Sequence, residues 1–239
     1  MKNYPVSELF YTFQGEGVHA GRAAFFVRLH GCPIKCPWCD SAGTWHPKYV
    51  PSNVSRMTAE EIGKSARDTD AQFVVVTGGE PTIHDLRELT ACLSESQDES
   101  HASRILPCHL ETSGAFEIKG DFSFITVSPK RERLPLDENL EKASEIKLII
   151  DSPEAFIEWD AYLDKHYFKK AKQFCSVWLH PEWSKRADKE VLTTISNAVK
   201  RYPALYRAGW QLHKLYQVDS LDTRSRPIVP LGGDINKGY

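Results

Sequence analysis

The sequence predicts an α/β protein built on a mostly parallel sheet, either an open sheet or an incomplete (β/α) barrel. Short runs rich in strand-forming residues, such as 24–31 and 72–79, end in glycine, as a strand that enters a turn does. Helix-like stretches separate most of these runs, and strands that are apolar throughout are typical of a parallel sheet covered by helices. The 239 residues suffice for one large domain, so we expect a single domain over 1–239, with a C-terminal extension from about residue 217.

Strands and helices alternate along the chain, and each helix has its own signal. Thr58, with Glu61 three residues later, forms a capping box that predicts a helix over the residues that follow. Ser152 before Pro153 is a typical N-cap and first-turn pair for another helix. Two further helices are expected, one with an apolar face at Leu86, Leu89 and Leu93, and one near 185–201. The seven expected strands are 24–31, 72–79, 105–114, 122–129, 145–151, 174–181 and 209–216.

Composition and charge limit the classes of partner. Lys and Arg number 30 against 32 Asp and Glu, and this near balance does not favour nucleic acid or an anionic membrane surface. The longest apolar runs are far shorter than the roughly 20 residues of a spanning helix, and no cationic and apolar leader opens the chain. We therefore expect a soluble cytoplasmic protein with a small-molecule substrate, which binds neither nucleic acid nor membrane.

Polar, often glycine-bearing stretches follow five of the expected strands. They are "HGCPIKC", "TGGEP", "ETSG", "SPK" and "HPEW", after the first, second, third, fourth and sixth strands. In open α/β sheets and barrels, sites are built at the carboxyl ends of the strands. Motifs that are distant in the chain are therefore expected to meet at one mouth.

Three of the six cysteines lie close together as Cys32, Cys36 and Cys39, in the spacing CxxxCxxC after the first expected strand. In a reducing compartment such a cluster indicates a metal or a redox site rather than a disulfide. A structural zinc takes four ligands, so His30 or His46 would have to complete it. Iron–sulfur clusters are held by cysteine thiolates, usually four, and three leave one iron of a four-iron cluster open. The dispersed cysteines, expected in the core, are Cys92, Cys108 and Cys175.

The spacing CxxxCxxC, with "TGGEP" (77–81) after the next strand, resembles the radical S-adenosylmethionine enzymes. The resemblance implies that Cys32, Cys36 and Cys39 hold a 4Fe-4S cluster whose open iron binds S-adenosylmethionine. It implies that one electron from the cluster cleaves this cofactor to a 5′-deoxyadenosyl radical, chemistry that the protein positions and shields. It also implies the incomplete (β/α) barrel of that superfamily.

Further stretches resemble the 7-carboxy-7-deazaguanine synthases, in the same order and over about residues 5 to 216. The resemblance implies a lyase that converts 6-carboxy-5,6,7,8-tetrahydropterin to 7-carboxy-7-deazaguanine with release of ammonia, in 7-deazapurine (queuosine) biosynthesis. It also implies magnesium, a homodimer, and an electron donor of the flavodoxin or ferredoxin type. The stretches are "FQGEG" (13–17), "FVRLHGCPIKCPWCDSAGTW" (26–45), "TGGEP", "ETSG" (111–114), "SPK" (128–130), "EIKLII" (145–150) and "QLHK" (211–214).

Residue chemistry and the resemblance together suggest the substrate contacts. Arg28 lies near the end of the first expected strand, where its guanidinium suits a substrate carboxylate; a salt-bridged strand arginine is the alternative. Gln14 and Glu16 suit the amino-pyrimidinone edge of a pterin, with a simple turn as the alternative. His213 and Lys214 either face the pocket or are ordinary strand residues. The expected substrate contacts are Phe13, Gln14, Gly15, Glu16, Arg28, Thr77, His213 and Lys214.

The resemblance also implies the residues around the cofactors, and it assigns no catalytic residue beyond those that position them. Ser41 would bind magnesium through its hydroxyl, where many relatives have threonine. His180, in "LHPEW", stands where relatives often have glutamine, and Leu212, in "QLHK", where threonine is frequent. The expected S-adenosylmethionine contacts are Trp38, Cys39, Asp40, Gly79, Glu80, Ser113, Ser128, Pro129, Lys130 and His180.

Two other functions stay open on the sequence alone. An activase that installs a glycyl radical in a partner protein shares the cysteine spacing, but it does not explain "FQGEG" with "TGGEP", "SPK" and "QLHK" together. A zinc-stabilised binding module is the alternative from a different class. The segment 218–239 is either a loosely ordered tail or, because of its apolar "PIVPL", packs on the mouth or on a second subunit.

Overall fold

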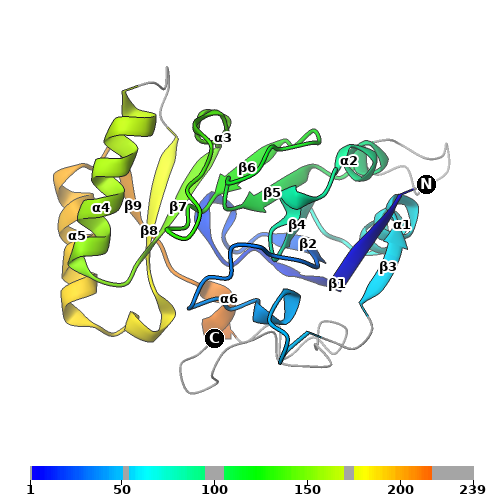
Figure 1. Cartoon of the computed structure of the whole chain (residues 1–239), viewed down its shortest axis with the longest axis horizontal. Helices are drawn as coiled ribbons and strands as arrows, with labels where there is room; N and C mark the ends of the chain where they lie inside the picture. The colour runs from blue at the N-terminus through cyan, green and yellow to red at the C-terminus, as the bar shows by residue number, and fades with distance from the viewer. Residues whose placement is uncertain (1, 51–53, 95–104, 170–174, 217–239) are drawn as a thin grey trace.

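The computed structural model describes residues 2–50, 54–94, 105–169 and 175–216 (Figure 1). The strands within these residues are β1 (Asn3–Phe13), β2 (Ala23–Leu29), β3 (Ser55–Thr58), β4 (Phe73–Gly78), β5 (Cys108–Thr112), β6 (Phe124–Val127), β7 (Glu145–Ile150), β8 (Ser176–Pro181) and β9 (Tyr206–Ala208). The α-helices are α1 (Ala59–Arg67), α2 (Arg87–Ser94), α3 (Asp137–Glu141), α4 (Pro153–Leu163), α5 (Lys189–Arg201) and α6 (Leu212–Tyr216). Short 3-10 turns lie at Gly17–His19, Ala42–Thr44, Pro81–Ile83 and Trp183–Lys185, and a π-helical turn, Asp164–Phe168, continues α4.

These strands form one sheet in the order β3-β1-β2-β4-β5-β6-β7-β8-β9. Every neighbouring pair from β2 and β4 to β8 and β9 is parallel, whereas β1 pairs antiparallel with both β2 and β3. The sheet ends at β3 and β9 and does not close on itself. The expected α/β fold, an incomplete barrel with a mostly parallel sheet, is confirmed. The extension expected from residue 217 lies outside the described residues.

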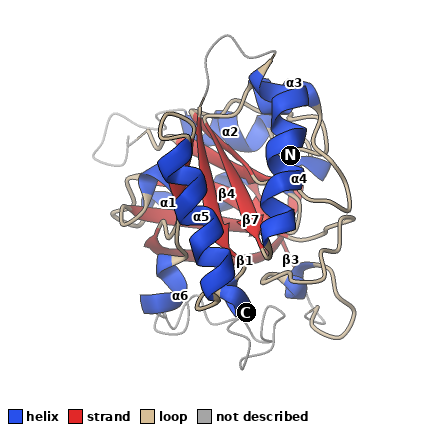
Figure 2. Ribbon diagram, turned by 90° about the vertical axis from the view of Figure 1, so that its left-hand side faces the viewer, coloured by secondary structure: helices blue, strands red, loops and turns tan. Residues whose placement is uncertain are grey.

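Helices cover the outer face of the sheet in two groups (Figures 1 and 2). One group packs α1 and α2 on β4, where Ile62 and Leu89 join Val74 in a buried apolar cluster. The other packs α4 and α5 on β7 and β8, where Leu163 joins Leu148. Because successive side chains of a strand point to opposite faces, the residues that alternate with these apolar ones face the interior of the barrel. Three expected site residues, Arg28, Thr77 and His180, lie on this interior face.

The expected helices are confirmed together with their caps. The Thr58 side chain accepts from the Glu61 amide while the Glu61 side chain accepts from the Thr58 amide, so the predicted capping box begins α1. Ser152 caps α4 by accepting from the Ala155 amide, as its place before proline predicts. Among the described residues, no helix has the length and apolarity needed to span a bilayer.

The strand expected at 209–216 is wrong, although the other six expected strands are confirmed. The last strand among the described residues is β9, and the Gly209 amide extends its pairing by one bond, to the Leu179 carbonyl. The chain then turns toward the start of the sheet, where the Leu212 amide donates to the Gly15 carbonyl, and α6 begins. Apolar and polar residues alternate here because the segment packs across the mouth, and not because it pairs with a strand.

Candidate functional site

The inner face of the sheet changes from aromatic to polar along the strands. Nearer their amino ends it carries an apolar cluster that includes Phe26 and Phe73, and the Phe73 ring stacks on His109 at 4.2 Å between centroids. Toward the carboxyl ends, Arg28 on β2 stands opposite Thr77 on β4. Polar interior side chains continue across the sheet, and they include Glu111, Thr126, Glu145, Lys147 and His180. The motifs expected at one mouth do meet there.

The cysteine loop and the "TGGEP" turn are packed directly together. The Glu80 amide donates to the Gly31 carbonyl at 2.8 Å, just before the first cysteine of the loop. A β-carbon at Gly79 would overlap this same carbonyl oxygen and Cβ of Cys32, so only glycine permits the contact. The turn after β4 therefore fixes the start of the cysteine loop.

The three thiols belong to one apolar pocket. Buried Cys36 packs with Ile34 and Ala115, and Cys32 and Cys39 pack against the same group. Burial raises the pKa of the Cys36 thiol to about 12, and it also raises the pKa values of the other two thiols. These thiols therefore stay protonated at neutral pH until a metal displaces their protons.

Hydrogen-bond donors of the loop point at two of the sulfurs. Backbone amides of Ile34 and Lys35 donate to Cys32, and the Ser41 amide and the Trp45 indole donate to Cys39. Donors of this kind stabilise thiolates, so the pocket fits a cluster held by three cysteines.

Ligands for a single metal ion are not assembled in the same way. Among the described residues, no group of three or more His, Cys, Asp or Glu side chains is close enough to hold one ion. His30 Nδ1 is 3.2 Å from the Ser7 hydroxyl, and His46 Nδ1 accepts from the Lys48 amide. Neither histidine completes a zinc site with the thiols. A four-iron cluster does not require its ligands to meet at one ion, because its thiolates bind separate iron atoms.

Glu80 holds the turns beyond β4 and β5 together. Its buried carboxylate accepts from the Thr112 hydroxyl at 2.6 Å and from the Ser113 amide at 2.8 Å, and also from Thr82. Ser113 and Glu80, expected near S-adenosylmethionine, are thus brought together, with Glu80 fixing the positions of the other groups.

Three more expected cofactor contacts gather beside the cysteine loop. Lys130 Nζ donates to the Ser128 hydroxyl at 2.7 Å and lies 5.5 Å from the centroid of the Trp38 ring. Pro129 lies between Ser128 and Lys130 in the chain. The ammonium group therefore stands next to the pocket of thiols.

His180 is fully buried, and neither of its ring nitrogens has a hydrogen-bond partner among the described residues. Burial lowers its pKa to about 4, so the ring is neutral at physiological pH. A β-carbon at Gly209 would overlap the ring, which explains the glycine at that position. The neighbouring Trp210 also has a buried indole nitrogen without a partner. Buried polar atoms without partners indicate a site for a ligand or water.

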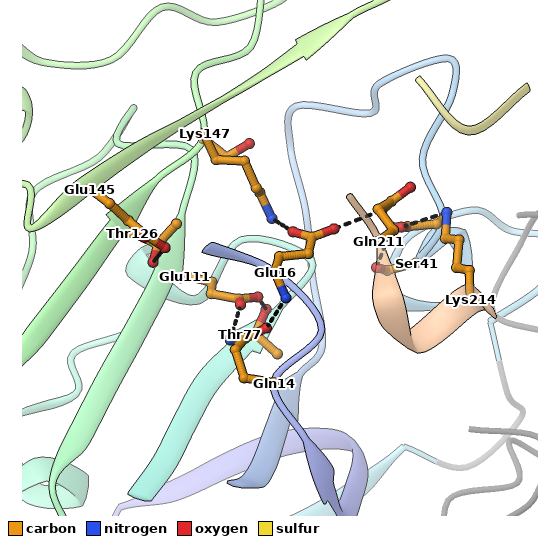
Figure 3. A network of polar contacts seen from close by, with 12 residues as sticks. Gln14, Glu16, Ser41, Thr77, Glu111, Thr126, Glu145, Lys147, Gln211 and Lys214 are labelled. Atoms are coloured by element: carbon orange, nitrogen blue, oxygen red, sulfur yellow. Dashed lines mark hydrogen bonds and ion pairs between the residues drawn. The ribbon is translucent and has the colours of Figure 1, made fainter. Parts of the chain in front are cut away.

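A second network of buried polar side chains begins in "FQGEG" (Figure 3). Gln14 Nε2 donates to Glu111 Oε1 at 2.9 Å, and Thr77 donates to Glu111 Oε2 at 3.1 Å. Glu16 forms an ion pair with Lys147, and its other oxygen accepts from Gln211 Nε2 at 2.8 Å. Three strands and two loops therefore supply one hydrogen-bonding wall.

Neighbouring charges decide the protonation states of Glu16 and Lys147 in this wall. Burial works against ionisation of Glu16, but Lys147, followed by His180 and His213, holds its pKa well below the usual range. Burial also works against a charged Lys147, yet Glu16 and Glu111 raise its pKa above the ordinary value. The pair is ionic at every pH where the protein is expected to work.

Arg28 forms the salt bridge that one sequence-based interpretation expects. Arg28 Nε forms a salt bridge with Glu8 Oε2 at 3.0 Å, and its Nη1 donates to the Ser41 hydroxyl at 3.3 Å. Ser41 in turn donates to Asp40 Oδ1 at 3.2 Å. The arginine is salt-bridged and also faces the residues that follow the cysteines.

Helix α6 brings the last described residues to the mouth. Its Lys214 forms an ion pair with Asp40 at 3.3 Å, and Tyr216 meets Phe13 edge to face at 5.6 Å. His213 occupies the space above Gly15, where a β-carbon would overlap the imidazole. His213 and Lys214 therefore lie at the mouth, on a helix instead of the expected strand.

Sequence reasoning missed several polar and charged members of the site. Glu111 and Lys147 lie in stretches that were recognised, "ETSG" and "EIKLII", but no role was assigned to them. A lysine in a strand that is otherwise apolar after Glu145 was the available signal for Lys147. The residues that were missed are Glu8, Glu111, Lys147 and Gln211.

Comparisons with known proteins identify the family of this chain. The profile of a family described as a 4Fe-4S single cluster domain matches residues 13–111. A 7-carboxy-7-deazaguanine synthase of Synechocystis is 39% identical over 188 residues, covering 79% of this chain and 82% of the relative. One from Flavobacterium psychrophilum is 34% identical over 214 residues, covering 90% and 92%. The crystal structure of QueE from Escherichia coli matches with a TM-score of 0.69 and 31% identity, over 88% of this chain and 95% of that one. The resemblance is confirmed, and the chain belongs to the 7-carboxy-7-deazaguanine synthase family.

Proposed function

We propose that the chain is a radical S-adenosylmethionine lyase that converts 6-carboxy-5,6,7,8-tetrahydropterin to 7-carboxy-7-deazaguanine, with release of ammonia, in queuosine biosynthesis. The names of its relatives and of its structural neighbour support this activity. The observation that carries it is the position of the three-thiol pocket beside the polar wall, at the same end of the sheet. A radical produced at the three-thiol pocket would reach a substrate held by the polar wall.

Cys32, Cys36 and Cys39 would hold the cluster in their apolar pocket, with amide and indole donors around the sulfurs. When bound, the cluster and S-adenosylmethionine supply one-electron reduction and abstraction of a hydrogen atom from the substrate. The protein's part is to hold, orient and shield them. Trp38, Ser128 and Lys130, with Pro129 between the last two, line the approach to the thiols, and Asp40, Gly79, Glu80 and Ser113 complete the proposed cofactor contacts.

The unpartnered nitrogens of His180 support a place for this residue beside the bound nucleoside. A neutral imidazole offers one donor and one acceptor, which suits the hydroxyl groups of a ribose or the edge of adenine. The same position would otherwise leave two buried polar atoms unpaired, which costs free energy.

The substrate would lie against the polar wall. Its amino-pyrimidinone edge presents N–H donors, and buried carboxylates are suitable acceptors, so we assign this edge to Glu111 and Glu16, with Gln14 and Thr77 orienting Glu111. Arg28 would bind the substrate carboxylate with the part of its guanidinium that reaches toward Ser41. The remaining proposed contacts are Phe13, Gly15, His213 and Lys214.

Magnesium is proposed with few protein ligands. The Ser41 hydroxyl lies between Arg28 and Asp40, and among the described residues no group of three or more His, Cys, Asp or Glu side chains could hold one ion. A hard cation bound through one or two protein oxygens takes the rest from water and substrate. We therefore expect magnesium to bind together with the substrate and weakly without it.

The remaining proposals concern the whole protein. By family, we propose a single domain over residues 1–239, a homodimer, and a flavodoxin or ferredoxin as the electron donor. A cytoplasmic location is consistent with such a donor. None of these is needed for the assignment of the reaction.

The test is to supply the reconstituted, reduced protein with S-adenosylmethionine and 6-carboxytetrahydropterin under anaerobic conditions. We expect 7-carboxy-7-deazaguanine and ammonia, and neither from Cys36→Ala. Release of 5′-deoxyadenosine without 7-carboxy-7-deazaguanine would contradict the substrate while leaving the radical chemistry in place. A colourless protein with stoichiometric zinc would contradict both.

Substitution of Arg28 tests the proposed contact with the substrate carboxylate in the same assay. Arg28→Lys keeps one positive charge but loses the planar fork, so kcat/KM for the pterin should fall about 10- to 100-fold, mostly through KM. Arg22→Lys is the matched control, because Arg22 is exposed and pairs with Gln72 at the other end of the sheet. An equal effect in both variants would contradict the assignment of Arg28.

A further inference from the structure

The indole of Trp45 is turned toward one of the three thiols. Its Nε1 lies 3.3 Å from Cys39 Sγ, close enough for an N–H to sulfur hydrogen bond. The Trp45 amide donates to the Ala42 carbonyl at 3.1 Å, which closes the 3-10 turn after the cysteine loop. His46 supports the ring edge-on, at 5.2 Å between centroids. Backbone and neighbour thus fix the indole in this orientation.

The surroundings of the thiols otherwise oppose added negative charge. The pocket wall is made of Ile34, Ala115 and Phe116, and apolar walls penalise any increase in charge on a group between them. A cluster held there becomes more negative when it accepts an electron, and part of that charge resides on its thiolate ligands. A hydrogen bond to a thiolate stabilises the more negative state, and such bonds are among the factors that set cluster potentials.

We propose that Trp45 is a positioning residue for the electron-transfer step: its indole N–H, by donating to the Cys39 sulfur, raises the reduction potential of the cluster. The inference rests on the proposed function, because it requires the cluster at these cysteines. It adds no step to the reaction. A flavodoxin- or ferredoxin-type protein still gives one electron to the cluster, and the cluster passes it to S-adenosylmethionine; the indole changes only how readily the first transfer occurs.

The test compares the reconstituted wild-type protein with Trp45→Phe, which keeps an aromatic ring but has no N–H. An anaerobic redox titration, followed by the electron paramagnetic resonance signal of the reduced cluster, gives the potential directly. We expect a lower potential in the variant, such that the ratio of reduced to oxidised cluster at a fixed solution potential falls about threefold to tenfold. A tenfold change corresponds to about 59 mV for a one-electron couple.

The matched control is Trp159→Phe, because Trp159 is an indole on α4 that packs in the outer apolar cluster, away from the cysteine loop. Its titration should coincide with that of the wild type. Iron and sulfide contents are measured first in all three proteins. A fully loaded Trp45→Phe protein with an unchanged potential would overturn the inference and leave the proposed function standing.

Two other outcomes are also decisive. Wild-type protein that holds no iron and sulfide overturns the proposed function and this inference with it. If Trp45→Phe alone loses the cluster, the hydrogen bond is tested in wild-type protein whose indoles are labelled with ¹⁵N. Pulsed electron paramagnetic resonance of the reduced cluster should then show a ¹⁵N hyperfine coupling. Trp38→Phe, labelled in the same way, should keep this coupling. Its absence in the wild type, or its loss in Trp38→Phe, would refute the Trp45 bond.

Discussion

Glu16 and Lys147 form a buried ion pair in the wall of the site, and their charges depend on each other. Removing one partner leaves the other charge buried without compensation, which is far more costly than removing both. We expect Glu16→Gln to lower the free energy of unfolding at pH 7 by about 3 to 5 kcal/mol in chemical denaturation.

The double variant Glu16→Gln with Lys147→Met is the control for this prediction. It removes both charges and should regain much of the lost stability. A double variant as unstable as the sum of the two single variants would show that the residues do not interact. Because the pKa of Glu16 is depressed in the folded protein, its stabilisation is present above the unfolded pKa and is lost only as pH falls toward the folded value.

His180 makes stability depend on pH in the mildly acidic range. Its pKa falls from 6.5 to about 4 on folding because the ring is buried. Below pH 6.5 the unfolded chain therefore binds a proton that the folded chain does not, so stability falls as pH falls. Between pH 7 and pH 5 this group should account for about 2 kcal/mol of lost unfolding free energy.

The comparison for His180 is His180→Gln, whose amide does not titrate. Chemical denaturation of the cluster-free proteins at both pH values should show the wild type losing about 2 kcal/mol more than the variant. Parallel losses in the two proteins would show that the imidazole is not buried in its neutral form.

At the scale of the elements, contact between α6 and the loop after β1 positions two of the proposed substrate residues. Gly15 lies under His213, and the Leu212 amide donates to the Gly15 carbonyl. Gly15→Ala should displace His213 and with it Lys214, which pairs with Asp40. We expect kcat/KM for the pterin to fall at least about tenfold, through loss of positioning.

The double variant Gly15→Ala with His213→Ala tests whether the clash is the cause. Removing the imidazole makes room for the new methyl group, so the double variant should be as active as His213→Ala alone. If Gly15→Ala lowers kcat/KM equally with and without the His213 side chain, its effect does not come from the clash with α6.

The elements also show how far sequence patterns reach. Central strands such as β4 and β7 are buried on both faces, so they appear as apolar runs, and their order and the converging motifs could be predicted. β1 was not predicted, because its buried residues alternate with half-buried ones, because the buried ones include Glu8, and because it contains Pro5. α6 was mistaken for a strand, because a five-residue helix has too few residues to show its own period.

At the scale of the whole molecule, the sequence could place the cysteine loop, "TGGEP", "ETSG" and "SPK" at one end of the sheet. Parallel strands guarantee this, whatever the details of the loops. It could not show that Glu111 receives hydrogen bonds from Gln14 and Thr77, or that Gln211 reaches Glu16, because such contacts join residues from 34 to 195 positions apart. Those pairings depend on curvature of the sheet and on side-chain packing, which short motifs do not encode.

The central claim is that the mouth of this barrel holds a pterin so that a radical from S-adenosylmethionine removes hydrogen from its carbon 6. The most direct measurement supplies 6-carboxytetrahydropterin that carries deuterium at carbon 6 and determines where the deuterium goes by mass spectrometry. We predict that deuterium appears in S-adenosylmethionine. The 5′ carbon that takes up the deuterium becomes a methyl group with two other hydrogens, and it can give one of these back to the substrate radical and keep the deuterium. Formation of 7-carboxy-7-deazaguanine with no deuterium in S-adenosylmethionine or in 5′-deoxyadenosine would contradict the account.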